Sequence, residues 1–453
     1  VNGMIYMRGQ AADYDHWRQL GNVGWGWDDV LPYFLKSEDH HDDDRAFHHS
    51  GGEWKVSRQR LSWDILHAVQ AGAAEFGVKP REDFNDGNNS GSGFFEVNQK
   101  NGLRWNTAQA FRRPARNRPK LRVLTRALTE GLVLDGKNVR GVRFSHRGQK
   151  FEAHARGEVL LAAGAINSPK ILEHSGIGNR AVLSDAGVEV RHELPSVGAN
   201  LQDHLQIRTV FGVENAETLN TLTNSLTGKA RIALQYALFR KGPMSMAPSQ
   251  FGMFTKSSPG LETPDLEYHV QPLSTDRLGE PLHPFPAITV SVCNLRPESR
   301  GDVHIVSPDT SSQPEIRLNY LSTTRDRHVA LASVRQARRI MTARALAPYD
   351  PREILPGPEL DGDEELMAAI GNIATTIFHP VGTCRMGVDD EAVVDPCLRV
   401  KGMRGLRIVD ASIMPKIVSG NTASPVVMIA EKAADLIKSA AGPGGQTGSG
   451  GIR

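Results

Sequence analysis

Hydrophobic positions follow strand-like patterns at three places between residues 94 and 190. Residues 121–125 (LRVLT) and 139–144 (VRGVRF) are short runs with β-branched side chains, bounded by turn residues, and each predicts a strand. Residues 158–165 (EVLLAAGA) form a continuous apolar run, which is typical of a strand that is buried on both faces of a sheet.

The residues after this apolar run have the pattern of a helix. Ser168 can cap a helix N-terminus, and Pro169 suits the first helical position, so we expect the helix to begin there. Gly176 and Gly178 suit its end. A strand that leads directly into a helix predicts an α/β core.

The same patterns return near the C-terminus. Residues 301–306 and 405–410 each predict a strand, and residues 423–437 predict a helix with Pro425 in its first turn. Residues 328–341 predict an amphipathic helix. Its apolar face is formed by Leu331, Val334, Ala337 and Met341.

The middle of the chain, residues 210–297, is richer in Pro, Ser and Thr and shows no regular period. We interpret it as a separate, less regular region. The Gly-rich end of the chain predicts a disordered tail.

Composition excludes several classes of protein. The 453 residues carry a net charge of only +2, which lacks the basic excess of a nucleic-acid-binding protein. No run of 18 apolar residues occurs, so no transmembrane segment is expected. The three cysteines show no CxxC spacing, which favours a reducing compartment.

A dinucleotide-binding fingerprint has one formal match, the GxGxxA of residues 176–181. A phosphate-binding loop needs a strand before it and a helix after it, whereas a helix is predicted before this match. We therefore interpret residues 176–181 as a helix-ending turn and expect no genuine fingerprint in this chain.

A metal site is suggested by residues 38–54 (EDHHDDDRAFHHSGGEW), which combine four histidines with several acidic residues. The run has no i, i+4 pair of ligands framed by apolar residues. We therefore expect a solvated loop and no metal ligands, and rank a metal-binding or structural protein last among the functions considered.

Two later segments carry candidate chemistry. His379 stands before a proline and close to Gly382, so a rigid turn can present it either to a cavity as an acid or base or to a core carbonyl. Asn421 precedes a helix whose positive end would favour a phosphate or a reduced flavin; alternatively, Asn421 is a local cap.

Asp410 lies at the carboxyl end of a predicted strand, where α/β folds place ligand contacts. With His379 and Ser419 it could form a hydrolase triad. Ser419 lacks the G-x-S-x-G elbow, which makes this alternative weak.

Together these segments resemble one family, the glucose–methanol–choline (GMC) oxidoreductases, which are FAD-dependent. The second family signature is complete in residues 164–178 (GAINSPKILEHSGIG), and the second half of the first signature matches residues 1–17 (VNGMIYMRGQAADYDHW). Further similar segments follow in family order. They are residues 194–205, 296–308, 319–322, 378–387 and 405–415.

The resemblance implies an α/β fold, α+β overall. A Rossmann-like FAD-binding domain, lacking its first βαβ unit, would be joined to a substrate-binding domain of antiparallel sheet and helices. The expected divisions are residues 1–206 for the FAD-binding region, 207–296 for the central substrate-binding region, 297–438 for the C-terminal region and 439–453 for the disordered tail.

The resemblance also implies the site residues. His379 matches the catalytic histidine, and Asn421 matches the second catalytic position. Val1 takes the place of a histidine that binds FAD covalently in some members, so non-covalent FAD is expected. The expected FAD contacts are Val1, Asn2, Gly3, Met4, Thr129, Phe378, Asp410, Ala411, Asn421, Thr422 and Pro425.

The implied function is oxidation of a primary alcohol, choline-like or another small alcohol, to the aldehyde by hydride transfer to flavin N5, with His379 as base. A dehydrogenase is expected rather than an oxidase, using a quinone, another acceptor or oxygen. A homo-oligomer is compatible with the family, as is a cytoplasmic location with peripheral attachment to the inner membrane. The alternative is a non-catalytic fragment that cannot bind FAD because the GxGxxG segment is missing.

Overall fold

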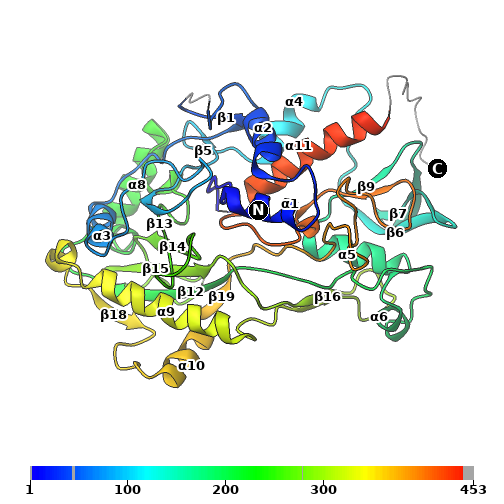
Figure 1. Ribbon diagram of the computed structural model, residues 1–453. Helices are drawn as coiled ribbons and strands as arrows, with labels where there is room; N and C mark the ends of the chain where they lie inside the picture. The colour runs from blue at the N-terminus through cyan, green and yellow to red at the C-terminus, as the bar shows by residue number, and fades with distance from the viewer. Residues whose placement is uncertain (1–2, 43–45, 278, 442–453) are drawn as a thin grey trace.

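The computed structural model describes residues 3–42, 46–277 and 279–441. A seven-stranded antiparallel sheet with helices lies at one end of the molecule, and the three-stranded sheet β6–β7–β8 lies at the other (Figure 1). The α helices are α1 (Ala11–Gln19), α2 (Trp27–Ser37), α3 (Asp64–Glu75), α4 (Arg113–Ala115), α5 (Gly164–His174), α6 (Arg180–Asp185), α7 (Leu219–Thr223), α8 (Leu226–Phe239), α9 (Thr324–Met341), α10 (Asp363–Ile373) and α11 (Ala423–Ala440). Short turns of other helix types are η1 (Ala108–Arg112), η2 (Pro243–Ser245), η3 (Arg344–Tyr349) and η4 (Ala411–Ile413).

The large sheet has the strand order β18-β12-β15-β14-β13-β3, and β19 also pairs with β12. Its strands are β3 (Gly91–Phe94), β12 (Leu205–Gly212), β13 (Phe251–Thr255), β14 (Leu266–Gln271), β15 (Ala287–Asn294), β18 (Arg352–Leu355) and β19 (Ala374–Thr376). The remaining strands are β1 (Glu38–Asp39), β2 (Trp54–Lys55), β4 (Gln99–Lys100), β5 (Leu103–Arg104), β6 (Ala127–Asp135), β7 (Asn138–His146), β8 (Gln149–His154), β9 (Val159–Leu161), β10 (Ile177–Gly178), β11 (His192–Glu193), β16 (Asp302–His304), β17 (Glu315–Arg317) and β20 (Leu406–Ile408).

The two faces of the large sheet differ in chemistry because side chains alternate along each strand. One face is apolar, and its Ile207, Tyr268 and Val292 share a core with α9. The opposite face, called here the polar face, is formed by Gln206, Arg208, Glu267, His269, Gln271, Thr289, Ser291 and Cys293. Phe254 on that side packs with Ile5 and Met7 of the N-terminal segment, so the polar face lies inside the molecule.

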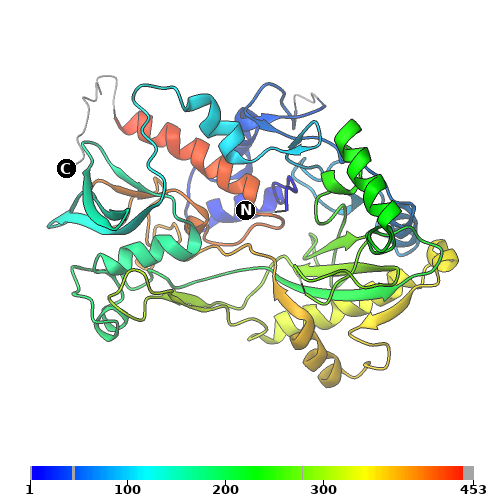
Figure 2. The same cartoon turned by 180° about the vertical axis from the view of Figure 1, so that it is seen from behind.

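Helices cover the apolar face as the hydrophobic pattern predicts. Val334, Ala337 and Met341 of α9 are buried, which confirms the predicted amphipathic helix, and α9 begins four residues earlier than predicted. The helix α8 lies on the opposite side of the sheet from α9 in both views (Figures 1 and 2).

The strand–helix unit around β9 supports the α/β prediction but begins its helix differently. The helix α5 starts at Gly164, so the predicted start at Ser168 and Pro169 is wrong, and Pro169 lies inside the helix. Because Pro169 has no N–H, the carbonyl of Ala165 lacks its helical donor. Thr383 Oγ1 donates to that carbonyl instead, at 2.6 Å.

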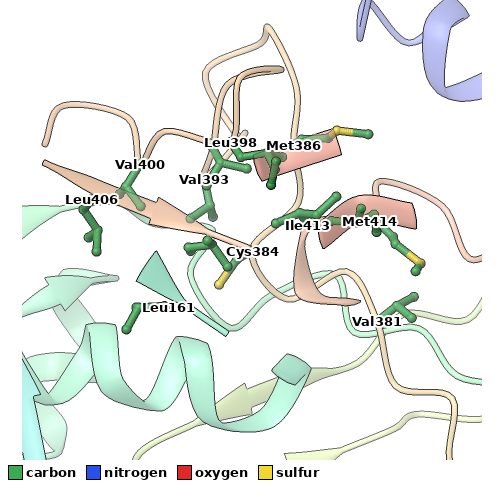
Figure 3. Packing of buried hydrophobic residues seen from close by; sticks show 14 of the residues in the cluster. Leu161, Val381, Cys384, Met386, Val393, Leu398, Val400, Leu406, Ile413 and Met414 are labelled. Atoms are coloured by element: carbon green, nitrogen blue, oxygen red, sulfur yellow. The ribbon is translucent and has the colours of Figure 1, made fainter. Parts of the chain in front are cut away.

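A second core surrounds the parallel pair β9–β20 and the helix α11. Figure 3 shows Cys384, Ile413 and Met414 among the side chains that fill it. The strands predicted at residues 139–144, 301–306 and 405–410 and the helix predicted at 423–437 are confirmed. The side chain of Leu160 in β9 is exposed, so the expectation of a strand buried on both faces is wrong for that residue.

Two further predictions are wrong. Residues 121–125 form no strand: their leucine and valine side chains are exposed, and β7 takes β6 as its hairpin partner. Residues 210–297 are not irregular, because they supply β13, β14, β15 and the last three residues of β12. Each of these strands is only five to eight residues long, and long connections separate them, which hid their alternation.

The structure bears on three predicted boundaries: the turn at residues 176–181, the region divisions and the start of the tail. Residues 176–181 form a helix-ending turn as predicted: α5 precedes Gly176, which has a φ of 77°, and Asn179 caps α6. The large sheet takes strands from all three predicted regions, and the divisions at 206/207 and 296/297 stay predictions. The helix α11 includes the first two residues assigned to the tail, whereas residues 442–453 lie outside the described part.

Within the described residues, no helix is both long and apolar enough to cross a membrane.

Replacing Thr383 with Val tests the bond opposite Pro169. Val has nearly the same shape but cannot donate, so the buried Ala165 carbonyl loses its partner and the free energy of unfolding should fall by about 1–3 kcal/mol. Chemical denaturation measures this. Thr342→Val is the matched control, since the Thr342 hydroxyl also donates to a carbonyl but is exposed. Equally small losses of unfolding free energy in Thr383→Val and Thr342→Val would contradict the importance of the Thr383 hydrogen bond.

Candidate functional site

His379 is held where the loop after β19 returns to the start of β12. Phe378 has a φ of 65°, a left-handed conformation that a bulky residue rarely adopts. Two hydrogen bonds hold this turn: Phe378 N donates to Thr376 Oγ1 at 2.8 Å, and His379 N donates to Asp203 Oδ1 at 2.8 Å. These bonds fix the backbone of His379 and therefore the point from which its side chain extends.

Asp203 is the common anchor of this region. Its carboxylate also accepts from the backbone N of His204 and from the hydroxyls of Tyr320 and Thr376. It is buried and fully bonded, so it fixes His204 and His379 relative to each other.

A chain of hydrogen bonds sets the tautomer of His379. His204 Nε2 lies 3.3 Å from the carbonyl oxygen of Leu295, which can only accept, so Nε2 of His204 carries the proton. In neutral His204 the other nitrogen, Nδ1, must accept. His379 Nδ1 lies 3.0 Å from it and therefore donates, which leaves the lone pair of His379 on Nε2.

Both rings are neutral near pH 7. Burial holds the pKa of His379 well below its usual range, and charge on His204 or His269 would lower it further. Burial also lowers the pKa of His204. A neutral imidazole with a free Nε2 lone pair can accept a proton from a bound hydroxyl.

Asn421 meets this lone pair. Its Nδ2 lies 3.3 Å from His379 Nε2, the geometry of a donor facing an acceptor. The loop before Asn421 is tied down by Ser419, whose N and Oγ both donate to Asp13 of α1 at 2.7 Å. A hydroxyl oxygen that contacts both nitrogens, in place of their direct hydrogen bond, would meet one acceptor and one donor.

The N-terminus of α11 next to Asn421 has unused polar groups. Thr422, at its N-cap, makes no side-chain cap, so the backbone N–H groups of Ala423 and Ser424 are not capped by it. Among the described residues, the buried Oδ1 of Asn421 and the buried Oγ of Ser424 have no partner. This donor and acceptor set fits an anionic or amide-bearing group such as a flavin ring.

The other predicted site residues come from several parts of the chain. Val1 and Asn2 are outside the described residues. Gly3 and Met4 begin the N-terminal segment, and Thr129 lies on β6. The remaining predicted residues lie near His379 or at the ends of β20 and α11. They are Phe378, Asp410, Ala411, Thr422 and Pro425.

The triad alternative is wrong. Ser419 Oγ donates to Asp13 rather than to His379. The carboxylate of Asp410 instead bonds the start of α5, through Gly164 N at 2.9 Å and Ser168 Oγ at 2.5 Å. Asp410 therefore joins β20 to α5.

Sequence reasoning missed the polar residues that surround His379. His204 and Asp203 lie in the family-like segment 194–205, which received no functional role. Glu267 and His269 of β14 are fully buried, and their side chains contact each other at 3.2 Å between Oε1 and Nε2. The alternation of LEYHVQ was the signal that could have placed both on one sheet face.

The prediction of a solvated loop at residues 38–54 is wrong for Glu38, His40 and His48, which are buried, whereas His41, Asp42, His49 and Glu53 are exposed as predicted. Glu38 pairs with Arg8 at 2.8 Å, and both side chains are buried. His48 lies between Glu38 and Asp83, at 3.1 and 3.2 Å. Arg8 already neutralises Glu38, and each of these groups has a protein partner, so we interpret the cluster as an ion-pair network that holds the N-terminal segment.

Comparison with known proteins gives the family. Profiles of the GMC oxidoreductases match residues 1–206 and 297–430. The alcohol dehydrogenase (acceptor) of Pseudomonas putida is 38% identical over 442 residues, which cover 96% of this chain and 80% of that protein. Human mitochondrial choline dehydrogenase is 37% identical over 440 residues, covering 97% of this chain and 74% of that protein.

Solved structures agree. The pyridoxine 4-oxidase structure from Mesorbium loti superposes with a TM-score of 0.85 at 30% identity, covering 95% of this chain and 81% of that one. An FAD-dependent oxidoreductase from Chaetomium thermophilum gives a TM-score of 0.88 at 25% identity, covering 97% and 85%. The fold is therefore that of this group of proteins.

His48→Gln tests the buried ion-pair network. Burial lowers the pKa of His48, but its bonds to Asp83 and Glu38 outweigh this and raise the pKa to about 9. Because the folded-state pKa exceeds the unfolded value of about 6.5, the stabilisation is complete below pH 6.5 and is lost as pH rises through 9.

The variant should therefore lose up to about 3 kcal/mol of unfolding free energy at pH 6, and the difference from the unmodified chain should shrink toward pH 10. Denaturant titrations at several pH values measure it. His49→Gln is the control, because His49 is exposed. A loss of unfolding free energy in His48→Gln that does not vary with pH would contradict a positively charged His48.

Proposed function

Because this chain belongs to the GMC oxidoreductase family, we propose that it oxidises an alcohol with FAD as its cofactor and His379 as the base. The observation that carries the proposal is the neutral His379 with its Nε2 lone pair facing the Nδ2 donor of Asn421. The relatives named alcohol dehydrogenase and choline dehydrogenase support an alcohol as the substrate.

The start of α11 would hold the flavin end of non-covalently bound FAD. Asn421, Thr422 and Pro425 lie there, and the uncapped backbone N–H groups and partnerless polar atoms fit that role. The other predicted contacts would be Val1, Asn2, Gly3, Met4, Thr129, Phe378, Asp410 and Ala411. FAD, when bound, supplies the acceptor for the hydride that leaves the alcohol carbon.

The protein's own residues manage the proton and the developing charge. The alcohol hydroxyl donates to His379 Nε2, which takes the proton as the C–H bond breaks. Asn421 Nδ2 donates to the same oxygen and stabilises its negative charge. His204 keeps Nδ1 of His379 occupied, so the accepted proton can reside only on Nε2. The product of a primary alcohol is the aldehyde.

We infer a dehydrogenase that passes electrons to a quinone or another acceptor rather than to oxygen. Relatives at 37–38% identity include the alcohol dehydrogenase (acceptor), which supports this inference. Relatives named oxygen-dependent choline dehydrogenase are 37% identical, so a parallel assay under oxygen is part of the test.

Replacing His379 with Ala tests the base. Reduction of bound FAD by alcohol under anaerobic conditions should slow by about 10²–10⁴-fold, since a positioned base contributes that much. Stopped-flow absorbance of the flavin measures the rate, and the FAD content of the purified protein checks that the cofactor is retained. The control His16→Ala removes an exposed histidine. Reduction of the His379→Ala protein at the unmodified rate would refute the assignment.

A further inference from the structure

Arg208 of β12 is a buried cation on the polar face of the sheet. Its exposed fraction is 6%. Among the described residues its guanidinium has no hydrogen bond and no ion pair, and its Nη2 is a buried atom without a partner. Burying a guanidinium without a partner costs free energy, so an unpaired buried arginine marks a place that a ligand completes.

Within the described part of the chain, no acidic side chain forms an ion pair with Arg208. Glu267 is on the same face but two strands away; it lies 3.2 Å from His269, and its carboxylate oxygens make no hydrogen bond with any described residue. Burial alone lowers the pKa of Arg208, with no contribution from a neighbouring carboxylate. Arginine nevertheless stays protonated in proteins, so Arg208 presents a fixed positive charge.

The polar face connects Arg208 with the proposed site. His204, Gln206 and Arg208 are every second residue along one strand direction, so their side chains point to the same side of the sheet. Across the sheet, Arg208 pairs with Ser291, which pairs with His269, and His204 contacts His379. Two strand spacings put Arg208 roughly 10 Å from His269 between Cα atoms.

We propose that this enzyme's substrate is an alcohol that carries a carboxylate, and that Arg208 binds the carboxylate while the hydroxyl contacts both His379 Nε2 and Asn421 Nδ2. This inference rests on the proposed function. The planar guanidinium matches a carboxylate with two parallel hydrogen bonds. The neighbouring Ser291 Oγ is buried and has no hydrogen-bond partner in the described part of the chain, so it can donate a further hydrogen bond.

The same charge discriminates against choline-like substrates. A quaternary ammonium placed beside Arg208 would meet its uncompensated cation, whereas the carboxylate of Glu267 lies two strands away on the same face. Arg208 lies four residues along the strand direction from His204, roughly 13 Å between Cα atoms, and His204 contacts His379. This separation favours an acid whose hydroxyl is at the far end of a carbon chain from the carboxylate, and ε-hydroxycaproate is a probe of this kind.

The kinetic test compares ε-hydroxycaproate, its methyl ester and choline as reductants of the bound flavin. The unmodified enzyme should prefer the acid. Arg208→Met should lower kcat/KM for the acid by about 100-fold and for the ester by less than about threefold. The kcat/KM of Arg208→Lys for the acid should lie between those two values, because lysine keeps the positive charge but cannot make the two parallel hydrogen bonds of a guanidinium. The control Arg140→Met removes an exposed arginine.

A binding measurement keeps the two proposals separable. Caproate, which cannot be oxidised at a hydroxyl, should raise the melting temperature of the FAD-loaded protein but not that of Arg208→Met. The variant should melt no lower than the unmodified protein, since it loses an unpaired buried charge. If caproate protects but no alcohol reduces the flavin, the proposed function fails and the carboxylate site stands. Equal use of acid, ester and choline, or equal losses on acid and ester in Arg208→Met, would overturn the carboxylate proposal.

Discussion

The contact between His204 Nδ1 and His379 Nδ1 is the constraint on which the site depends. Each ring has one proton to place, and the Leu295 carbonyl decides where the proton of His204 goes. Asp203 then fixes the backbone of both histidines with one carboxylate. Because burial disfavours a charge on either ring, the free lone pair of His379 can only be on Nε2, where Asn421 and a substrate hydroxyl would meet it.

The large sheet makes this arrangement possible by separating its two faces. Its apolar face packs on α9 and supplies a core, while its polar face is buried toward the N-terminal segment. Partnerless buried atoms on this face, and at the start of α11, leave unmet hydrogen-bonding capacity where ligands would bind. Burial of apolar side chains on one face of the sheet thus offsets the free-energy cost of burying polar side chains on the other face.

Local sequence patterns predicted the parts of the fold that depend on local structure. The helices α9 and α11 and the strand β20 have clear periods, and His379 and Asn421 stand in recognisable motifs. The burial of His48 and Arg8 could not be read in this way, because their partners Asp83 and Glu38 are distant in sequence. The start of α5 was misplaced because a distant hydroxyl, that of Thr383, bonds the carbonyl left free by Pro169.

The central claim is that His379 is a neutral imidazole with its proton on Nδ1. Nitrogen-15 NMR of the protein with labelled histidine, assigned by comparison with His379→Ala, measures the tautomer directly. Between pH 6 and 8 the account predicts a protonated Nδ1 and an unprotonated Nε2 for His379. A proton on Nε2, or an imidazolium in that range, would contradict it.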